Sequence, residues 1–309
     1  SRGPAHLDDL DMNPLLISVD GAQKIKYNRN RERQAVPDTL DADIVKDAEP
    51  FFKDGEKMQL SYAVQNTHRT IGTRVSSHIV QRFGMNNSLQ ANHLTVKLTG
   101  SAGQSLGAFA APGLKLEVSG DANDYVGKGL SGATIVIRPP LASPLVAADN
   151  TIIGNTVLYG ATAGRLFANG RAGERFAVRN SGATVVVEGC GTNGCEYMTG
   201  GVAVILGSTG ANFGAGMTGG MAYVYDPEGR FEDMINRETL VTASVAEEYW
   251  EDQLKVLIKD HLAETGSVKA ADILRLWEEE KSNFIQVCPK EMLAHLPAPL
   301  AEELGAKTA

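Results

Sequence analysis

The stretch Thr199-Gly200-Gly201-Val202-Ala203-Val204-Ile205 decides the fold, because the chain repeats it with small changes. The other copies are Thr218-Gly219-Gly220-Met221-Ala222-Tyr223-Val224, Ser181-Gly182-Ala183-Thr184-Val185-Val186-Val187 and Ser131-Gly132-Ala133-Thr134-Ile135-Val136-Ile137. The copies that start at residues 181, 199 and 218 lie 18 and 19 residues apart. Internal repetition at such a period is typical of a solenoid, in which each repeat buries its apolar face against the next one. The middle of the chain is therefore predicted to be a stack of strands.

Glycines recur at the corners between these strands. The pattern Gly100-x-x-Gly103-x-x-x-Gly107 returns as Gly207-x-x-Gly210-x-x-x-Gly214. A chain that turns within a few residues needs positive φ angles or room for one backbone to approach another, and glycine permits both. Because the copies are not hexads, a β-helix with longer coils fits them better than the hexapeptide type. The stretch 138–150, which contains prolines, is predicted to be a loop inserted between two strands.

Composition excludes some classes of function. The 309 residues carry a net charge of −8, which argues against nucleic-acid binding. The three cysteines are odd in number and form no Cys-x-x-Cys pair, which favours a reducing, cytoplasmic compartment. The sequence has no run of 18 apolar residues and no secretory leader, so we expect no contact with a membrane. Since the chain begins with Ser-Arg-Gly, we interpret it as a processed product or an excised piece of a larger protein.

The pattern of charges and apolar residues divides the chain into three segments of one structural unit. Residues 1–90 are expected to form a lead-in that packs on the solenoid, with a helix near 40–52 and an extended stretch over 58–64. Residues 91–240 are expected to form the glycine-rich β-helix, in which strands run to about residue 225. Residues 241–309 are expected to form a helical extension.

The helical extension is expected to contain two amphipathic helices. Ser244-Val245-Ala246-Glu247 matches a capping box before the first helix, and Gly266 is a natural C-terminal stop. Ser267 is placed to cap a second helix that ends near the acidic residues 278–280. We expect these helices to cover the open end of the solenoid, where unpaired strand edges would otherwise invite association.

Three stretches are candidates for chemical sites, and none is assigned a catalytic, cofactor-binding or metal-binding role. Gly207 to Gly220 resembles a phosphate loop, but a strand-like sequence follows it where such a loop needs a helix. Cys190 and Cys195 could form a redox pair or supply two metal ligands, but no third Cys or His lies nearby in the sequence. Buried structural thiols are therefore favoured. The run from His68 to Arg74, with His78 beyond it, offers an anion or acid–base site. Without a carboxylate in the same run, we expect its polar groups to tie the lead-in to the first coils.

Several long motifs resemble one family. They are Asn66-Thr67-His68-Arg69-Thr70-Ile71-Gly72-Thr73-Arg74, Gly100-Ser101-Ala102-Gly103-Gln104-Ser105-Leu106-Gly107, Gly120-Asp121-Ala122-Asn123-Asp124-Tyr125-Val126-Gly127-Lys128-Gly129-Leu130-Ser131-Gly132 and Gly194-Cys195-Glu196-Tyr197-Met198-Thr199-Gly200-Gly201. The motifs look like the C-terminal GXGXG domain of the glutamate synthase large subunit, and the resemblance covers nearly the whole chain.

The resemblance implies a mainly β fold, a right-handed parallel β-helix with an irregular N-terminal lead-in and C-terminal α-helices. It also implies a parent enzyme that makes glutamate from glutamine and 2-oxoglutarate with FMN and a 3Fe-4S cluster. The expected partners are the amidotransferase and synthase domains of the same polypeptide and a small NADPH-oxidising subunit; in other members ferredoxin supplies the electrons. The cofactor sites and the nucleophilic cysteine of the family belong to regions outside this chain, so Cys190, Cys195 and Cys288 are not assigned to them.

The leading hypothesis is a noncatalytic scaffold that holds the catalytic domains of glutamate synthase in register. One alternative is a stand-alone β-helical subunit of another redox complex, similar to the glycine-rich β-helical subunit of formylmethanofuran dehydrogenase. Another is an independent enzyme or binding protein that uses the His68 to Arg74 run or the Cys190 to Cys195 loop.

Overall fold

The computed structural model describes residues 11–16, 37–86 and 89–301 of the chain. The chain divides into two compact units, residues 1–37 and 38–309. The described part of the first unit contains one short helix, α1 (Asn13–Leu16), on which Leu15 and Leu16 are exposed. The second unit holds the strands and the helices that pack on them.

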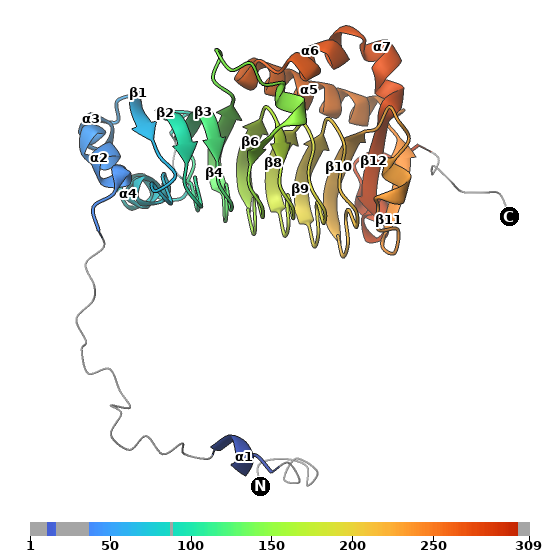
Figure 1. The fold of residues 1–309 in the computed structure, drawn as a ribbon, viewed down its shortest axis with the longest axis horizontal. Coiled ribbons are helices and arrows are strands. Elements are labelled where there is room, and N and C mark those ends of the chain that lie inside the picture. The colour runs from blue at the N-terminus through green and yellow to red at the C-terminus, as the bar shows by residue number, and fades with distance from the viewer. Residues whose placement is uncertain (1–10, 17–36, 87–88, 302–309) are drawn as a thin grey trace, which may run out of the picture. The chain divides into compact units, whose positions relative to one another are not determined.

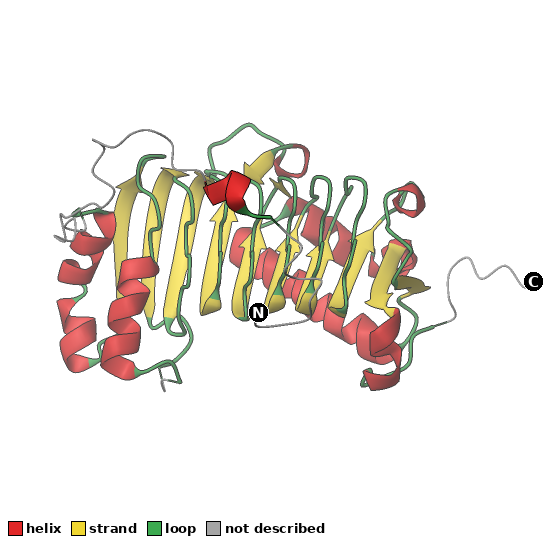
Figure 2. Cartoon of the chain, turned by 90° about the horizontal axis from the view of Figure 1, so that it is seen from below, coloured by secondary structure: helices red, strands yellow, loops and turns green. Residues whose placement is uncertain are grey.

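A mixed sheet runs through the second unit, and Figures 1 and 2 both show its strands side by side. In the described residues it has twelve strands, and its main path follows the order β1-β2-β3-β4-β6-β8-β9-β10-β12-β11 without closing on itself. The strands of this path are β1 (Met58–Val64), β2 (Leu94–Ala102), β3 (Leu114–Ala122), β4 (Ser131–Arg138), β6 (Ala163–Ala168), β8 (Ser181–Val187), β9 (Thr199–Ile205), β10 (Gly219–Tyr225), β12 (Phe284–Pro289) and β11 (Leu240–Ser244). Two short strands lie off the path, β5 (Thr151–Ile153) and β7 (Arg171–Ala172).

The predicted strand repeats are confirmed. The four quoted copies form β4, β8, β9 and β10, and each strand from β1 to β10 along the path pairs in parallel with its neighbour. The predicted interruption after Arg138 is also confirmed, because irregular chain and a short 3₁₀ helix, η2 (Ala147–Asp149), separate β4 from β5. The expectation of a mainly β chain with C-terminal helices therefore holds.

The turns between the strands are as regular as the strands. Backbone hydrogen bonds join equivalent turn residues, as where the Ser105 N–H donates to the Asp124 carbonyl and the Tyr125 N–H to the Asn155 carbonyl, both at 2.9 Å. Six successive turns carry positive φ angles at three alternate positions. These are 105/107/109, 125/127/129, 156/158/160, 175/177/179, 193/195/197 and 212/214/216.

The strands bury side chains on both faces. In β8, Val185 and Val187 belong to one apolar cluster that also contains Leu116 and Ile135. Val186, between them, belongs to a second cluster under the C-terminal helices, with Phe167 of β6. A strand that is buried on both faces needs a continuous apolar run rather than an alternating one, which explains the Thr-Val-Val-Val sequence.

The N-terminal end of the sheet is packed by three helices. They are α2 (Leu40–Asp47), α3 (Glu49–Asp54) and α4 (Thr73–Phe83), next to β1 in Figure 1. Ile44, Phe51 and Ile79 of these helices are fully buried in the first apolar cluster. The one helix expected near 40–52 is two consecutive helices, α2 and α3, and the extended stretch over 58–64 is confirmed as β1.

The C-terminal segment differs from its prediction in two ways. It contributes strands β11 and β12, and β12 pairs antiparallel with β10, so strands rather than helices continue the sheet there. The long helix α5 (Glu248–Thr265) packs instead across β4, β6 and β8. The expectation that the helices cover the open end of the stack is therefore wrong. Trp250, Leu254 and Ile258 of α5 instead cover the face of the sheet that carries Val186 and Phe167.

The predicted helix boundaries are partly right. Ser244 ends β11 and does not cap α5, whose N-cap is Glu247 without a side-chain hydrogen bond. Gly266 ends α5 with φ 70°, and the Ser267 hydroxyl caps α6 (Val268–Arg275) by accepting from the Ala270 N–H at 3.0 Å. The second helix ends at Arg275, earlier than predicted, and the acidic residues 278–280 lie in a separate short helix, α7 (Trp277–Glu280). The described residues also contain the 3₁₀ helices η3 (Phe231–Asp233), η4 (Lys281–Asn283) and η5 (Lys290–His295). Within the described ranges, none of the helices has the length and apolar character needed to cross a membrane.

Candidate functional site

The run from His68 to Arg74 is used for structure, as its interpretation predicted. The Gly103 N–H donates to the His68 carbonyl at 3.1 Å, and the Thr70 N–H donates to the Gln104 carbonyl at 2.9 Å. The Thr73 hydroxyl donates to the Ala108 carbonyl at 2.8 Å. These bonds tie the turn after β1 to the turn after β2.

A buried carboxylate that no sequence motif marks completes this region. Asp41 of α2 is 3% exposed and accepts from the N–H groups of Gly72 at 2.7 Å and Arg74 at 2.8 Å. It therefore supplies the N-terminal cap of α4 from 31 residues away, because Gly72 itself has no side chain to do so. Desolvation raises the pKa of Asp41, although the backbone hydrogen bonds to Gly72 and Arg74 act in the opposite direction.

The two cysteines of the loop after β8 are buried thiols, as predicted. Cys190, Cys195 and the distant Cys288 are free and fully inaccessible. Desolvation raises the pKa of Cys190 to about 12 and that of Cys195 well above its ordinary value. Thiols held in the protonated form are poor nucleophiles and poor metal ligands. Among the described residues, no group of three or more His, Cys, Asp or Glu side chains is placed to hold a metal ion.

The glycine-rich stretch from Gly207 to Gly220 joins two strands. β9 precedes it and β10 starts at Gly219, so no helix N-terminus faces the loop where a phosphate would sit. A Cβ atom at Gly219 would lie 2.1 Å from the Thr199 carbonyl oxygen of the neighbouring strand. Close packing of the two backbones accounts for this glycine.

A buried polar network anchors the C-terminal helices to the sheet. The side chain of Glu188, after β8, is 1% exposed, and the Ser267 hydroxyl donates to its Oε1 atom. The ring of His261 from α5 is fully buried, with Nε2 3.7 Å from the same oxygen. The Asn169 amide also reaches both carboxylate oxygens, at 3.1 and 3.3 Å, when its nitrogen faces them. Hydrogen bonds of this kind offset the cost of burying a carboxylate.

Two ion pairs add to this attachment. Lys115 of β3 lies 2.7 Å from Glu264 of α5, and Arg165 of β6 pairs with Asp260 of the same helix. The hydroxyl of Tyr223 in β10 donates to Gln253 at 2.8 Å. Helix α5 is therefore fixed to several strands by polar contacts, in addition to its apolar face.

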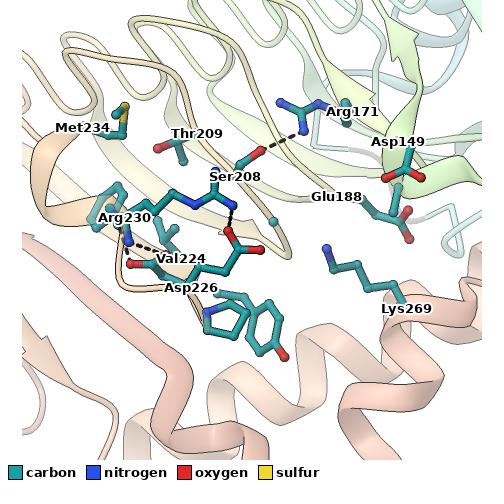
Figure 3. Close-up of a pocket in the computed structure, with 16 residues that line it drawn as sticks. Asp149, Arg171, Glu188, Ser208, Thr209, Val224, Asp226, Arg230, Met234 and Lys269 are labelled. Atoms are coloured by element: carbon teal, nitrogen blue, oxygen red, sulfur yellow. Dashed lines mark hydrogen bonds and ion pairs between the residues drawn. The ribbon is translucent and has the colours of Figure 1, made fainter.

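A polar cavity of about 350 Å³ lies beside the Glu188 network (Figure 3). Arg171 of β7 points toward it and donates to the Ser208 hydroxyl at 2.7 Å. Lys269, in the first turn of α6, extends toward Glu188, and desolvation lowers its pKa while the Glu188 charge opposes that change. Arg230 pairs with Glu228 at the far side. The cavity presents charges of both signs and suits polar partners.

An apolar groove of about 630 Å³ adjoins this cavity and shares Glu188 and Lys269 with it. The loop 139–147 forms one wall, and helix α6 forms the other. Four apolar side chains that line the groove are exposed, Leu141 by 91%, Val268 by 75%, Val146 by 63% and Leu145 by 59%. Exposed apolar side chains gathered in this way are typical of surfaces that bind another macromolecule or a ligand.

Sequence reasoning had no signal for the groove beyond the loop itself. The prolines predict the loop, but its position against α6 depends on helices about 120 residues later in the chain. The buried Glu188 is likewise missed, since its partners Ser267 and His261 are distant in sequence.

Comparisons with known proteins agree on one family. The GXGXG motif family matches residues 41–290. The chain is 62% identical over 300 residues to the NADPH glutamate synthase large chain of Azospirillum brasilense, covering 97% of this chain and 20% of that protein. It is 46% identical over 302 residues to the NADH glutamate synthase of Schizosaccharomyces pombe, covering 96% of this chain and 14% of that protein. It is 45% identical over 285 residues to ferredoxin-dependent glutamate synthase 2 of Synechocystis sp., covering 91% of this chain and 18% of that protein.

The chain thus spans a fifth or less of the length of these relatives. All three are glutamate synthases, so the alternative of a formylmethanofuran dehydrogenase subunit is not favoured.

Proposed function

The chain belongs to the GXGXG motif family, and from this membership we propose that it acts as a noncatalytic structural domain of a glutamate synthase. In this proposal it holds the glutaminase and synthase regions of a longer polypeptide in register. Those regions make glutamate from glutamine and 2-oxoglutarate and carry the FMN and the 3Fe-4S cluster. A small NADPH-oxidising subunit is a further proposed partner, and the proposed compartment is the reducing cytoplasm.

The observation that carries the proposal is the continuous backbone ladder. Parallel strands from β1 to β10 follow one another along the sheet path, and hydrogen bonds also join their turns. Such a stack resists bending, because any bend must stretch bonds in both the strands and the turns. A rigid body of this kind suits a spacer between two catalytic centres.

The same observation supports a finer proposal for the fold. Strands and turns of equivalent units lie in register, and the repeated copies have a solenoid period. We propose that these units are coils of a right-handed parallel β-helix, because connections between parallel strands are nearly always right-handed. The predicted segments 1–90, 91–240 and 241–309 are then its proposed lead-in, coils and helical extension; residues 1–10, 17–36, 87–88 and 302–309 of these segments lie outside the described residues.

The test is to weaken the stack in the complete enzyme and measure three rates. Gly120→Ala disturbs the contact between β2 and β3, and Gly160→Ala is a matched change in open space. We expect Gly120→Ala to lower the yield of glutamate per glutamine hydrolysed, while glutaminase activity and ammonia-dependent synthesis persist. Gly160→Ala should leave all three unchanged. If Gly120→Ala abolished synthesis from ammonia in a folded enzyme with full cofactor content, the domain would take part in the chemistry and the proposal would be wrong.

A second test addresses the alternative of an independent site. Replacing His68 and Arg69 by alanine in the complete enzyme removes the side chains of the polar run but keeps the backbone bonds of His68 and Thr70. Unchanged glutaminase, synthase and coupling are expected. Loss of either activity with the fold retained would favour a functional site there.

A further inference from the structure

We propose that the apolar groove between loop 139–147 and α6 is a docking site for an apolar segment from the remaining part of the glutamate synthase polypeptide. The inference rests on the proposed function and adds the surface through which the domain makes contact. Its basis is the exposure of the groove, its preformed shape, its polar surroundings and the length of chain that lies elsewhere in the relatives.

The exposed side chains of the groove carry the first step. Leu141 is 91% exposed and Val268 is 75% exposed, and they come from opposite walls. Burying one such aliphatic side chain contributes about 1.5–3 kcal/mol. These side chains stay in water, whereas Val186 and Phe167 on the sheet face under α5 are buried. A partner that fills the groove would gain the stabilisation of burying them.

The wall formed by the loop is held in shape before any partner arrives. Prolines at 139, 140 and 144 restrict its backbone. The Ser143 N–H donates to the Pro140 carbonyl at 2.8 Å, and the Asn150 side-chain amide donates to the Val146 carbonyl at 2.7 Å. A second apolar cavity of about 310 Å³ lies where the loop meets β2 and β3. Because the loop is already ordered, docking costs little conformational entropy.

The surroundings of the groove have the composition of a protein interface. The apolar centre is bordered by the polar cavity, where Arg171, Lys269 and Asp149 gather (Figure 3). An apolar centre with a polar rim is typical of surfaces that bind other proteins. The partner is therefore expected to present apolar side chains to the groove and polar groups to Lys269 and its neighbours.

The choice of occupant follows from length and charge. This chain corresponds to 20% of the Azospirillum relative, so about four fifths of such a polypeptide lies outside it. A scaffold must contact the rest of the polypeptide through some surface. This groove is suited to that contact because it combines exposed apolar side chains with a preformed shape. A second copy of this chain is less suitable, because two bodies of net charge −8 repel each other.

The test labels single cysteines in the complete enzyme. Leu141→Cys places a thiol in the groove, and Val256→Cys places one on α5, where Val256 is 53% exposed and lines none of the cavities described above. Both variants are treated with a maleimide, and the labelled peptides are followed by mass spectrometry. On this chain alone Leu141 is the more exposed position, so docking must reverse the order. We expect the cysteine at 141 to react at least about tenfold more slowly than the one at 256.

Three results separate the inference from its rivals. Labelling at 141 that is as fast as at 256 would overturn it. Protection at 141 that disappears on dilution, together with a halved molecular mass, would assign the groove to a second copy and also overturn it. A loss of coupling in Gly120→Ala with fast labelling at 141 would leave the scaffold proposal standing and remove only the groove from it.

Discussion

The replacement Gly120→Ala probes the closest backbone contact between neighbouring repeats. Gly120 of β3 pairs directly with Gly100 of β2, and a Cβ atom at Gly120 would lie 1.9 Å from the Gly100 carbonyl oxygen. The obstacle is backbone in a paired strand, so no side-chain rotation relieves it. The φ angle of Gly120 is +153°, a value that residues with side chains rarely adopt.

The expected loss combines two effects. Holding alanine at an unfavourable φ angle costs about 1–3 kcal/mol. Separating the strands enough to admit the Cβ atom weakens at least one or two ladder hydrogen bonds, each contributing about 1 kcal/mol. The sum is about 2–5 kcal/mol in the free energy of unfolding. Gly160→Ala tests the φ-angle cost alone, because Gly160 has a φ angle of +67° and no atom lies within 4 Å of the added Cβ. This replacement should lower the free energy of unfolding by about 1 kcal/mol.

Urea unfolding of the purified chain, followed by far-ultraviolet circular dichroism, measures both variants against the parent. The midpoint for Gly120→Ala should fall clearly below that for Gly160→Ala, with similar slopes. Equal midpoints would show that the contact between Gly100 and Gly120 does not limit the approach of the strands. Close backbone packing would then not explain the glycines within the strands.

Three other predictions concern buried polar groups. Ser267→Ala removes both the cap of α6 and the hydrogen bond to buried Glu188, and it should lower the free energy of unfolding by about 2–4 kcal/mol in the same urea assay; a loss below about 0.5 kcal/mol would contradict this role. The three cysteine thiols, all buried and with raised pKa values, should resist Ellman's reagent at pH 8 in the folded chain and react fully in urea; rapid reaction of the folded chain would contradict their burial. The pKa of Asp41 is raised in the folded chain, so the stabilisation that Asp41 contributes should be largest below its ordinary pKa of 3.8 and should decline as pH rises through its pKa in the folded chain. The free energy of unfolding of the parent relative to Asp41→Asn should therefore fall over that pH interval. An increase over the same interval would refute the assigned direction.

The strands were predictable where the repeats keep their glycine and β-branched residues. β8, β9 and β10 have this pattern and were located closely. β6 was missed, because Arg165 stands where β4 and β8 have a threonine, and Phe167 stands where they have a valine. Arg165 pairs with α5, and Phe167 packs under it. Contacts with a distant helix have altered the local pattern there.

The C-terminal strand and the polar sites could not be read from local patterns. β12 joins the sheet next to β10 although about 60 residues separate them, and its neighbour β11 precedes it in the chain. The sites of Asp41 and Glu188 could not be predicted for the same reason, because the hydrogen-bond partners of each carboxylate are distant in sequence and come near it only in the folded chain. A carboxylate in a sequence gives no sign of whether it will be buried or which N–H or hydroxyl it will meet.

The turns explain why the glycine pattern is incomplete as a sequence signal. Six turns require the same left-handed backbone at three positions, yet glycine fills all of these positions in none of them. Thr156, Arg175 and Tyr197 adopt the left-handed conformation at a cost of about 1–2 kcal/mol each. They are held there because equivalent turn residues on either side form hydrogen bonds with them or with their neighbours. The repeated unit within this chain is therefore the backbone turn. A glycine is required where a neighbouring backbone lies close, as at Gly219, and most strongly where a positive φ angle adds to that contact, as at Gly120.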